Sequence, residues 1–260
     1  MKSRALTLVV IIGVLAVAGI GLGRVVDPAW SQFRSRQPAL QLRSTAAAAR
    51  QGATLALLGG FRALVADGIW IRLYAVWERQ ELAATDALAH LVTAVDPRPA
   101  YFWINGARMI AYDLAAWRIQ TEGGYDVVPE AIQQRINHEQ ARLALVHLQA
   151  AMEFHPHNPD LWVERANIEL NRLGDVAAAA GSYRRAYEEP HGPYYAARLH
   201  AELLRRSGRP EEALAWLVRL HPSLPPGDEG AAADVVLGRI RDLERQLGVP
   251  PERAYRPPTR

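Results

Sequence analysis

The chain has 260 residues, of which 50% are hydrophobic and 22% are charged, a composition typical of a folded protein rather than a disordered one. It contains no cysteine, which excludes disulfide bridges, cysteine-ligated metal sites and cysteine nucleophiles. The formal net charge is only +3 and no block of five or more basic residues occurs, so the charge does not indicate binding to nucleic acid.

The first 37 residues carry the pattern of a membrane anchor. Basic Lys2 and Arg4 precede Ala5 to Gly23, a run of 19 residues without a charge. As a helix this run would be about 28 Å long, which matches the ~30 Å hydrocarbon core of a bilayer. We expect residues 5–23 to cross a membrane once. A cleaved signal peptide is the alternative, because Ala16-Val17-Ala18 offers a small-residue cleavage site.

The charges around this run also bear on its orientation. Lys2 and Arg4 lie before the run, and three arginines lie after it between residues 24 and 36. The positive-inside rule counts such residues and is almost balanced here. The basic, signal-like start favours an N-terminus in the cytoplasm and a C-terminal domain on the other side of the membrane.

Residues 38–65 are predicted to form membrane-proximal helices. Ser44 to Leu58 is rich in alanine, a strong helix former, and Gly59-Gly60 would end that helix. A further helix is expected from Phe61 to Arg79.

The middle of the chain repeats a helical pattern at a regular interval. In each copy an alanine is followed four residues later by Leu or Tyr, then by a small or apolar residue, and then by Pro. The alanines that begin the last three copies, Ala144, Ala179 and Ala213, are separated by 35 and 34 residues. Ala87 begins the first copy, 57 residues before Ala144. This interval is 34 plus 23, and we place an insertion of 23 residues near 120–135.

A second helical pattern precedes each copy. It carries Trp70, Trp103, Trp162 and Ala197, each of which shares a helix face with the residue four positions later. Turn residues such as Gly208-Arg209-Pro210 separate the two helices. The unit is therefore a helix–turn–helix of about 34 residues, and one unit cannot bury its apolar face unless it stacks on the next.

This unit resembles the tetratricopeptide repeat (TPR), and the chain resembles bacterial TPR proteins with an N-terminal membrane anchor. The resemblance covers residues 66–225, about four repeats, and is most specific for the last two. It implies an all-α solenoid of helical hairpins, held on the periplasmic side of a bacterial inner membrane. A helix from Ala231 to Leu247 would cap the stack, and residues 226–260 would end in a loose tail after Pro251.

In TPR proteins the first helix of each repeat lines a concave groove that binds peptides or proteins. Asparagine can bond a peptide backbone as donor and acceptor, arginine can hold a carboxylate, and tyrosine offers flat contact area. Some family members clamp a terminal carboxylate with lysine, which is absent here, so that arginine would have to replace it. The candidate groove residues are Tyr101, Arg108, Tyr112, Asn167, Asn171, Tyr195, Arg198, Glu202 and Arg205.

No catalytic signature occurs in the sequence, which lacks G-x-S-x-G, Walker A, H-E-x-x-H and G-x-G-x-x-G motifs. Four histidines lie close in sequence, and we interpret His138, His147, His155 and His157 as inter-repeat turn residues rather than metal ligands. We therefore expect a scaffold or assembly factor without enzymatic activity, cofactor or metal. Its partner would be a membrane-bound or exported protein or peptide, and not a nucleic acid. The alternative is a constitutive subunit of a larger membrane complex.

Overall fold

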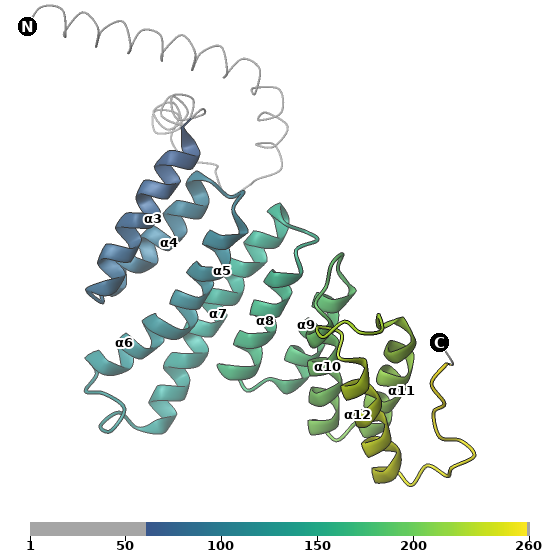
Figure 1. Ribbon diagram of the computed structural model, residues 1–260. Coiled ribbons are helices and arrows are strands. Elements are labelled where there is room, and N and C mark those ends of the chain that lie inside the picture. Colours follow the sequence, from purple (N-terminus) through teal and green to yellow (C-terminus); the bar gives the residue numbers. More distant parts are fainter. Residues whose placement is uncertain (1–60, 259–260) are drawn as a thin grey trace, which may run out of the picture.

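The computed structural model describes residues 61–258, and this part of the chain is helical, without a strand (Figure 1). The all-α prediction is confirmed for these residues. The predicted anchor at 5–23 and the helix predicted from Ser44 to Leu58 lie outside them. Between residues 61 and 258, no helix is both long enough and apolar enough to cross a bilayer.

Short connections join the helices along the chain. The helices of the N-terminal half are α3 (Arg62–Glu78), α4 (Leu82–Val95), α5 (Ala100–Arg108), the π-helical turn η2 (Met109–Asp113), α6 (Leu114–Thr121) and α7 (Glu130–Phe154). Those of the C-terminal half are α8 (Pro159–Asn171), α9 (Val176–Glu188), α10 (Tyr194–Arg206), α11 (Pro210–Leu220), the 3₁₀ turn η3 (His221–Ser223) and α12 (Ala233–Gln246).

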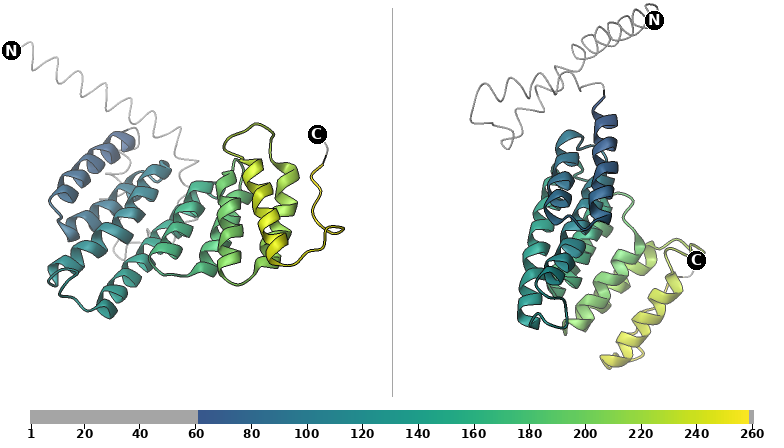
Figure 2. Two further views of the ribbon diagram at one scale, coloured as in Figure 1. Left: turned by 60° about the horizontal axis from the view of Figure 1, so that its bottom comes forward. Right: turned by 90° about the vertical axis from the view of Figure 1, so that its left-hand side faces the viewer.

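These helices form a row of hairpins in which each hairpin lies beside the next. α3 packs on α4, α8 on α9 and α10 on α11, while α9 also packs on α10 and joins two hairpins (Figure 1). In Figure 2 the C-terminal helices are inclined to the N-terminal ones, so that the row changes direction along its length. Every hairpin thus buries its apolar side against a neighbour.

Alanines are buried between neighbouring helices of the row. Ala144, Ala179 and Ala213, which begin the last three copies of the repeated pattern, are 0% exposed, as is Ala197 on the preceding helix pattern. Ala87, which begins the first copy, is instead exposed on α4. A methyl group lets two helix backbones come close, and larger neighbours fill the adjoining space. Two of the tryptophans at the equivalent position, Trp70 and Trp103, are also buried.

The second hairpin is longer than the others because both of its helices are extended. α5, η2 and α6 form one helical path from Ala100 to Thr121, and α7 has 25 residues. The insertion expected near 120–135 therefore comprises the end of α6, the connection at 122–129 and the first turns of α7. The π turn of η2 accommodates an extra residue within this path, as such turns do elsewhere.

Capping residues define where the helices of the third hairpin begin. Asn158 Oδ1 accepts from the backbone N–H of Asp160 at 2.9 Å, and Asp175 Oδ1 accepts from that of Ala178 at 2.9 Å. Pro159 and Pro210 stand at the first position of α8 and α11, where a missing N–H costs no helical hydrogen bond.

α12 closes the C-terminal end of the row. It packs on α11 and buries Val236, Ile240 and Leu243. The tail beyond it, expected to be loose, is held at Tyr255. Its hydroxyl lies 3.0 Å from Nδ1 of His221, and its backbone N–H donates to Glu244.

Candidate functional site

The nine residues predicted for a binding groove lie on the first helices of three successive hairpins. α5 carries Tyr101 and Arg108, η2 carries Tyr112, α8 carries Asn167 and Asn171, and α10 carries Tyr195, Arg198, Glu202 and Arg205. The structure brings five of them together: Arg108, Tyr112, Asn167, Asn171 and Tyr195. The other four have separate surroundings.

Arg108 ties α5 to α8 through a buried carboxylate. Its Nη2 and Nε lie 2.7 and 2.8 Å from Oε2 of Glu164, whose residue is only 2% exposed. A buried carboxylate that lost this partner would be an uncompensated charge, so the pair constrains how α5 sits on α8. From sequence, Glu164 and Glu169 both stand beside Arg165, and solvated ion pairs with Arg165 are the expected role of these two carboxylates. In the structure Arg165 bonds the next glutamate along the helix, Glu169, at 2.8 Å.

Asn167 lies between two tyrosines. The hydroxyl of Tyr183 on α9 donates to Asn167 Oδ1 at 2.6 Å, and that of Tyr112 donates to the backbone carbonyl of Asn167 at 3.4 Å. The amide nitrogen of Asn167 donates to no group among residues 61–258, although the residue is half-buried. Tyr183 thus fixes the amide by its oxygen and leaves two N–H donors for a ligand. We call Arg108, Tyr112, Glu164, Asn167 and Tyr183 the Asn167 cluster.

The tyrosines of this region remain neutral donors. Burial raises the pKa of Tyr112, Tyr183 and Tyr195 above the ordinary value of the phenol. For Tyr112, a hydrogen bond from Asn171 and the charge of Arg172 act in the opposite direction, and the Arg172 guanidinium lies 4.3 Å from the centre of the Tyr112 ring. A surface of neutral hydroxyls and amides beside one paired arginine is suited to hydrogen bonding and not to proton transfer.

Tyr101 and Arg198 serve contacts within the protein. The hydroxyl of Tyr101 lies 3.2 Å from that of Tyr74, so the contact joins α5 to α3. Nη1 of Arg198 donates to the backbone carbonyls of Gly230 and Ala231 at 2.8 and 3.0 Å. Arg198 therefore fixes the segment that leads into α12.

Glu202 and Arg205 belong to an ion-pair network on the surface of α10. Glu202 Oε1 lies 2.7 Å from Nη2 of Arg205 and 3.0 Å from Nε of Arg206. The hydrogen bond from Arg205, together with Arg206, lowers the pKa of Glu202 to about 2. The carboxylate that Arg205 holds in the structure is thus one from its own helix.

The four neighbouring histidines do not converge. His155 Nε2 lies 3.0 Å from the carbonyl of Pro97, and His157 Nδ1 lies 3.1 Å from Glu189. His138 and His147, expected in turns, instead lie within α7, where His147 is buried. In the part of the chain that the structure describes, no three His, Asp or Glu side chains are grouped so that they could hold a metal ion.

Comparison with known proteins adds no further guide to function. Neither models of known protein families nor the curated proteins contain a match to this chain. The residues of the Asn167 cluster and their geometry therefore carry the functional argument.

Proposed function

We propose that this protein is a membrane-anchored, TPR-like scaffold or assembly factor that binds an extended peptide segment of a partner protein across α5, α8 and α10. The row of hairpins with alanines buried between neighbouring helices supports the TPR-like solenoid. The apolar run at 5–23 supports an anchor in a bacterial inner membrane, with the helical part on the periplasmic side. Such an anchor would raise the local concentration of a membrane-bound or exported partner near the helices.

The observation that carries this proposal is the free amide nitrogen of Asn167. An extended peptide presents backbone carbonyls at its edges, and a fixed amide donor can bond one of them without first losing rotational freedom. Asn171 lies one helical turn after Asn167 on α8, and Tyr195 on α10 is near enough to Arg108 to feel its charge; both are exposed, so they extend the polar surface along the row. Tyr195 provides flat contact area with two rotatable bonds.

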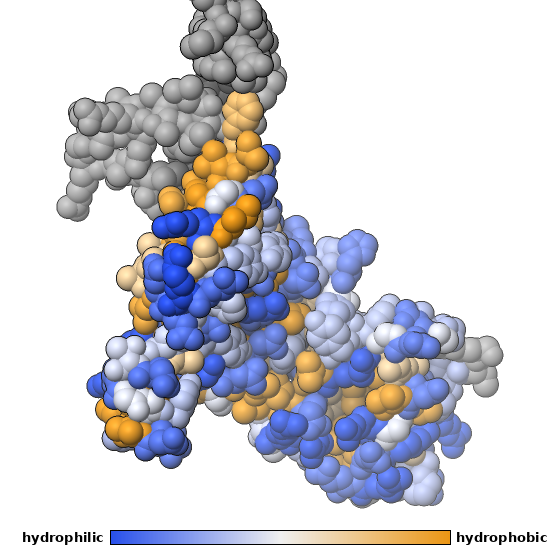
Figure 3. All heavy atoms as spheres, turned by 60° about the vertical axis from the view of Figure 1, so that its left-hand side comes forward, coloured by the Kyte–Doolittle hydropathy of each residue, from blue (hydrophilic) through white to orange (hydrophobic). Residues whose placement is uncertain are grey.

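A second candidate function is a constitutive subunit of a larger membrane complex, and a different surface favours it. Phe61, Leu64 and Ile71 are 44%, 68% and 71% exposed. Figure 3 shows hydrophobic residues gathered along this end of α3. Val127, at the tip of the long hairpin, is also 71% exposed. Large exposed apolar side chains in such numbers are typical of surfaces that another chain covers.

A photo-crosslinking experiment in the full-length chain tests the peptide-binding proposal. The photoreactive residue benzoylphenylalanine is incorporated in place of Tyr195, and the protein is irradiated in its native cells. The control protein carries the same residue in place of Val235, which is similarly exposed (55%) but lies on α12. We expect a discrete adduct from position 195, formed with one partner, and none from position 235.

Two substitutions show whether the adduct depends on the amide of Asn167. N167D keeps an oxygen for Tyr183 and removes the N–H donors, whereas Tyr183→Phe removes the orienting hydrogen bond and keeps the donors. We expect N167D to abolish the adduct and Tyr183→Phe to weaken it. An adduct that survives N167D unchanged would reject this surface as the binding site and favour the subunit alternative.

A further inference from the structure

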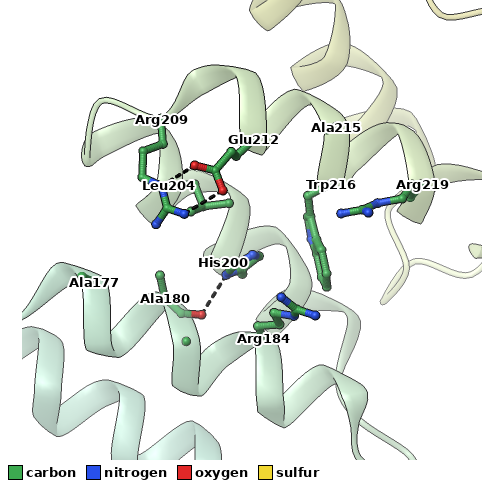
Figure 4. A pocket seen from close by; sticks show the side chains of 11 residues that line it. Ala177, Ala180, Arg184, His200, Leu204, Arg209, Glu212, Ala215, Trp216 and Arg219 are labelled. Carbon is green, nitrogen blue, oxygen red and sulfur yellow. Dashed lines mark hydrogen bonds and ion pairs between the residues drawn. The ribbon is translucent and has the colours of Figure 1, made fainter.

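A hollow of about 300 Å³ lies on the other side of α10 from the predicted groove. His200 and Leu204 line it, and they are about half a helical turn away from Tyr195 and Glu202. α9 and α11 form the walls of the hollow and α10 its floor (Figure 4). Small residues line both walls and leave the hollow open between them: Ala177, Ala180, Gly181 and Ala215.

Two aromatic rings in the hollow are held in fixed orientations. Trp216 Nε1 donates to the backbone carbonyl of Ala197 at 3.0 Å, and His200 Nδ1 lies 2.8 Å from the carbonyl of Ala180. A carbonyl can only accept, so Nδ1 of His200 carries the proton and Nε2 keeps its lone pair. The two rings meet edge to face with their centres 4.6 Å apart.

The hollow is positively charged. Three arginines and one glutamate line it, and Glu188, which pairs with Arg184, leaves a net charge of +1. Arg209 is neutralised by Glu212, with N···O distances of 2.5 and 2.6 Å, and Arg184 bonds Glu188 at 2.7 Å while its guanidinium lies 5.6 Å from the Trp216 ring. Arg219, on the other side of Trp216 in Figure 4, makes no ion pair with any residue between 61 and 258.

We propose that this hollow is a second binding site, which takes an acidic, extended peptide segment of a partner protein. Arg219 and Arg184 would pair with its carboxylates, in the bidentate geometry that guanidinium groups favour. The small residues of α9 and α11 would let a peptide backbone approach, and the Trp216 ring would cover one side of it. The site goes beyond the function proposed above, because it uses the opposite face of α10 and different residues.

The acceptor on His200 favours a peptide over a simple anion. Burial, with the charges of Arg184 and Arg209, holds the pKa of His200 below its ordinary value, against the hydrogen bond to Ala180 and the charge of Glu188. The ring is therefore neutral near physiological pH, and Nε2 accepts a hydrogen bond. A backbone N–H of a peptide supplies that donor, whereas a free carboxylate would place one acceptor against another.

The test uses a fluorescein-labelled peptide of six glutamates and the full-length protein in detergent micelles, with binding followed by fluorescence anisotropy. We expect binding that weakens as salt rises. Arg219→Gln should weaken it about tenfold, the effect of losing one charge-assisted pair. The matched control is Arg239→Gln, which removes the same charge from an exposed site on α12 and should change the affinity less than about twofold.

A second variant fills the hollow without changing its charge. A Cβ at Gly181 would meet no atom within 4 Å, and the residue is exposed. Leucine is also the better helix former, so Gly181→Leu should fold, and its longer side chain at the lining of the hollow should block the peptide. N167D should leave this binding unchanged, which separates the two proposed sites. Three outcomes would overturn the proposal: no binding to the wild type, equal losses in Arg219→Gln and Arg239→Gln, or full binding by Gly181→Leu. Displacement of the peptide by free glutamate at the peptide's own affinity would assign the hollow to small anions instead.

Discussion

The two halves of the described chain fill the space between their helices in different ways. In the C-terminal half, the cluster between α8, α9 and α10 consists mainly of alanines: Ala166, Ala179, Ala180, Ala186 and Ala196. In the N-terminal half, the cluster between α3, α4 and α5 relies on large side chains: Trp70, Leu73, Phe102 and Met109. The alanine cluster lies between three helices of 13 residues each, α8, α9 and α10. The 25-residue α7 belongs to a third cluster, in which Ala141, Ala144 and Ala151 pack with Trp103 and Ile110.

The comparison shows two solutions to the same packing problem. Helices that meet at alanines come close, so their stability depends on keeping those positions small. Helices held apart by aromatic rings depend on keeping the rings, because nothing else occupies their volume. Enlarging a side chain should therefore destabilise the helices that meet at alanines, and shortening one should destabilise the helices that pack around aromatic rings.

The largest expected effect comes from Trp103, which stands at the repeat position that Ala197 occupies in the C-terminal half. Trp103 is 6% exposed, stacks on Phe154 with ring centres 5.7 Å apart, and donates to the carbonyl of Pro97 at 2.9 Å. Trp103→Ala should lower the free energy of unfolding by about 3–5 kcal/mol. Ala197→Leu should lower it by about 1–3 kcal/mol through overpacking. Thermal unfolding followed by circular dichroism measures both, and a neutral Trp103→Ala would contradict the aromatic account of this half.

Two buried histidines extend the comparison to polar groups. His200 in the C-terminal half bonds the carbonyl of Ala180, while Nε2 of His147 in the N-terminal half is buried without a hydrogen-bond partner among residues 61–258. Burial, with a smaller contribution from the charge of His90, lowers the pKa of His147 from 6.5 to about 3. In the unfolded chain His147 therefore becomes protonated below about pH 6.5, whereas in the folded chain it stays neutral down to about pH 3.

This difference predicts acid sensitivity that one substitution removes. As the pH falls from about 7 to about 4, His147 should lower the free energy of unfolding by about 3 kcal/mol, because only the unfolded chain gains the proton. His147→Leu should be nearly neutral at pH 7, because no hydrogen bond to Nε2 is lost, and should flatten the fall in stability below pH 6.5. Denaturant titrations of the two proteins over this pH range measure the difference, with His138→Gln on the same helix as the control. Parallel pH curves for wild type and His147→Leu would contradict the prediction.

The Arg108–Glu164 pair lies where the two halves meet. Arg108→Met should lower the free energy of unfolding by about 2–3 kcal/mol, below the range for fully buried pairs because the Arg108 side chain is half exposed. Adding Glu164→Gln to that variant should recover part of the loss, since a neutral amide needs no opposite charge. A double-mutant cycle by denaturant unfolding measures the coupling. A coupling energy near zero would show that water replaces Arg108 at no cost.

The regular half of the fold was accessible from the sequence because its pattern is local. Ala179 and Ala213 were placed by spacing alone and are fully buried, as is Ala144, which carries the same pattern on α7. The same spacing also placed Ala87, which is exposed on α4. The spacing also revealed extra residues in the second hairpin. It could not show that they lengthen α6 and α7, because a count of residues does not distinguish a loop from two longer helices.

The site was less accessible, because its partners are distant in sequence or are backbone atoms. Glu164 bonds Arg108, 56 residues earlier, and not its neighbour Arg165. Tyr183 lies on a second helix, where the repeat pattern predicts core residues and no groove. Arg198 binds two carbonyls, which carry no signal in the sequence. The resemblance to TPR proteins assigned Tyr101 and Arg198 to a groove, and the structure gives both side chains contacts within the protein.

The smallest expected effect compares two helical glycines, one in each half. A side chain at Gly238 on α12 would meet no atom within 4 Å, and the residue is exposed. Gly238→Ala should therefore raise the free energy of unfolding by about 0.5–1 kcal/mol, the difference in helix propensity.

At Gly106 on α5 the same methyl group would lie 3.0 Å from Nε2 of His147 and 3.7 Å from the Cβ of Ala89. Gly106→Ala should therefore lose the propensity gain and lower the stability, since the tightly packed ring of His147 would have to move. Adding His147→Ala to Gly106→Ala opens that space and should restore the gain from alanine relative to His147→Ala alone. A stabilising Gly106→Ala in the wild-type background would show that the N-terminal half has spare room. The contrast between a half held by close packing of large groups and a half held by alanines would then fail at its tightest point.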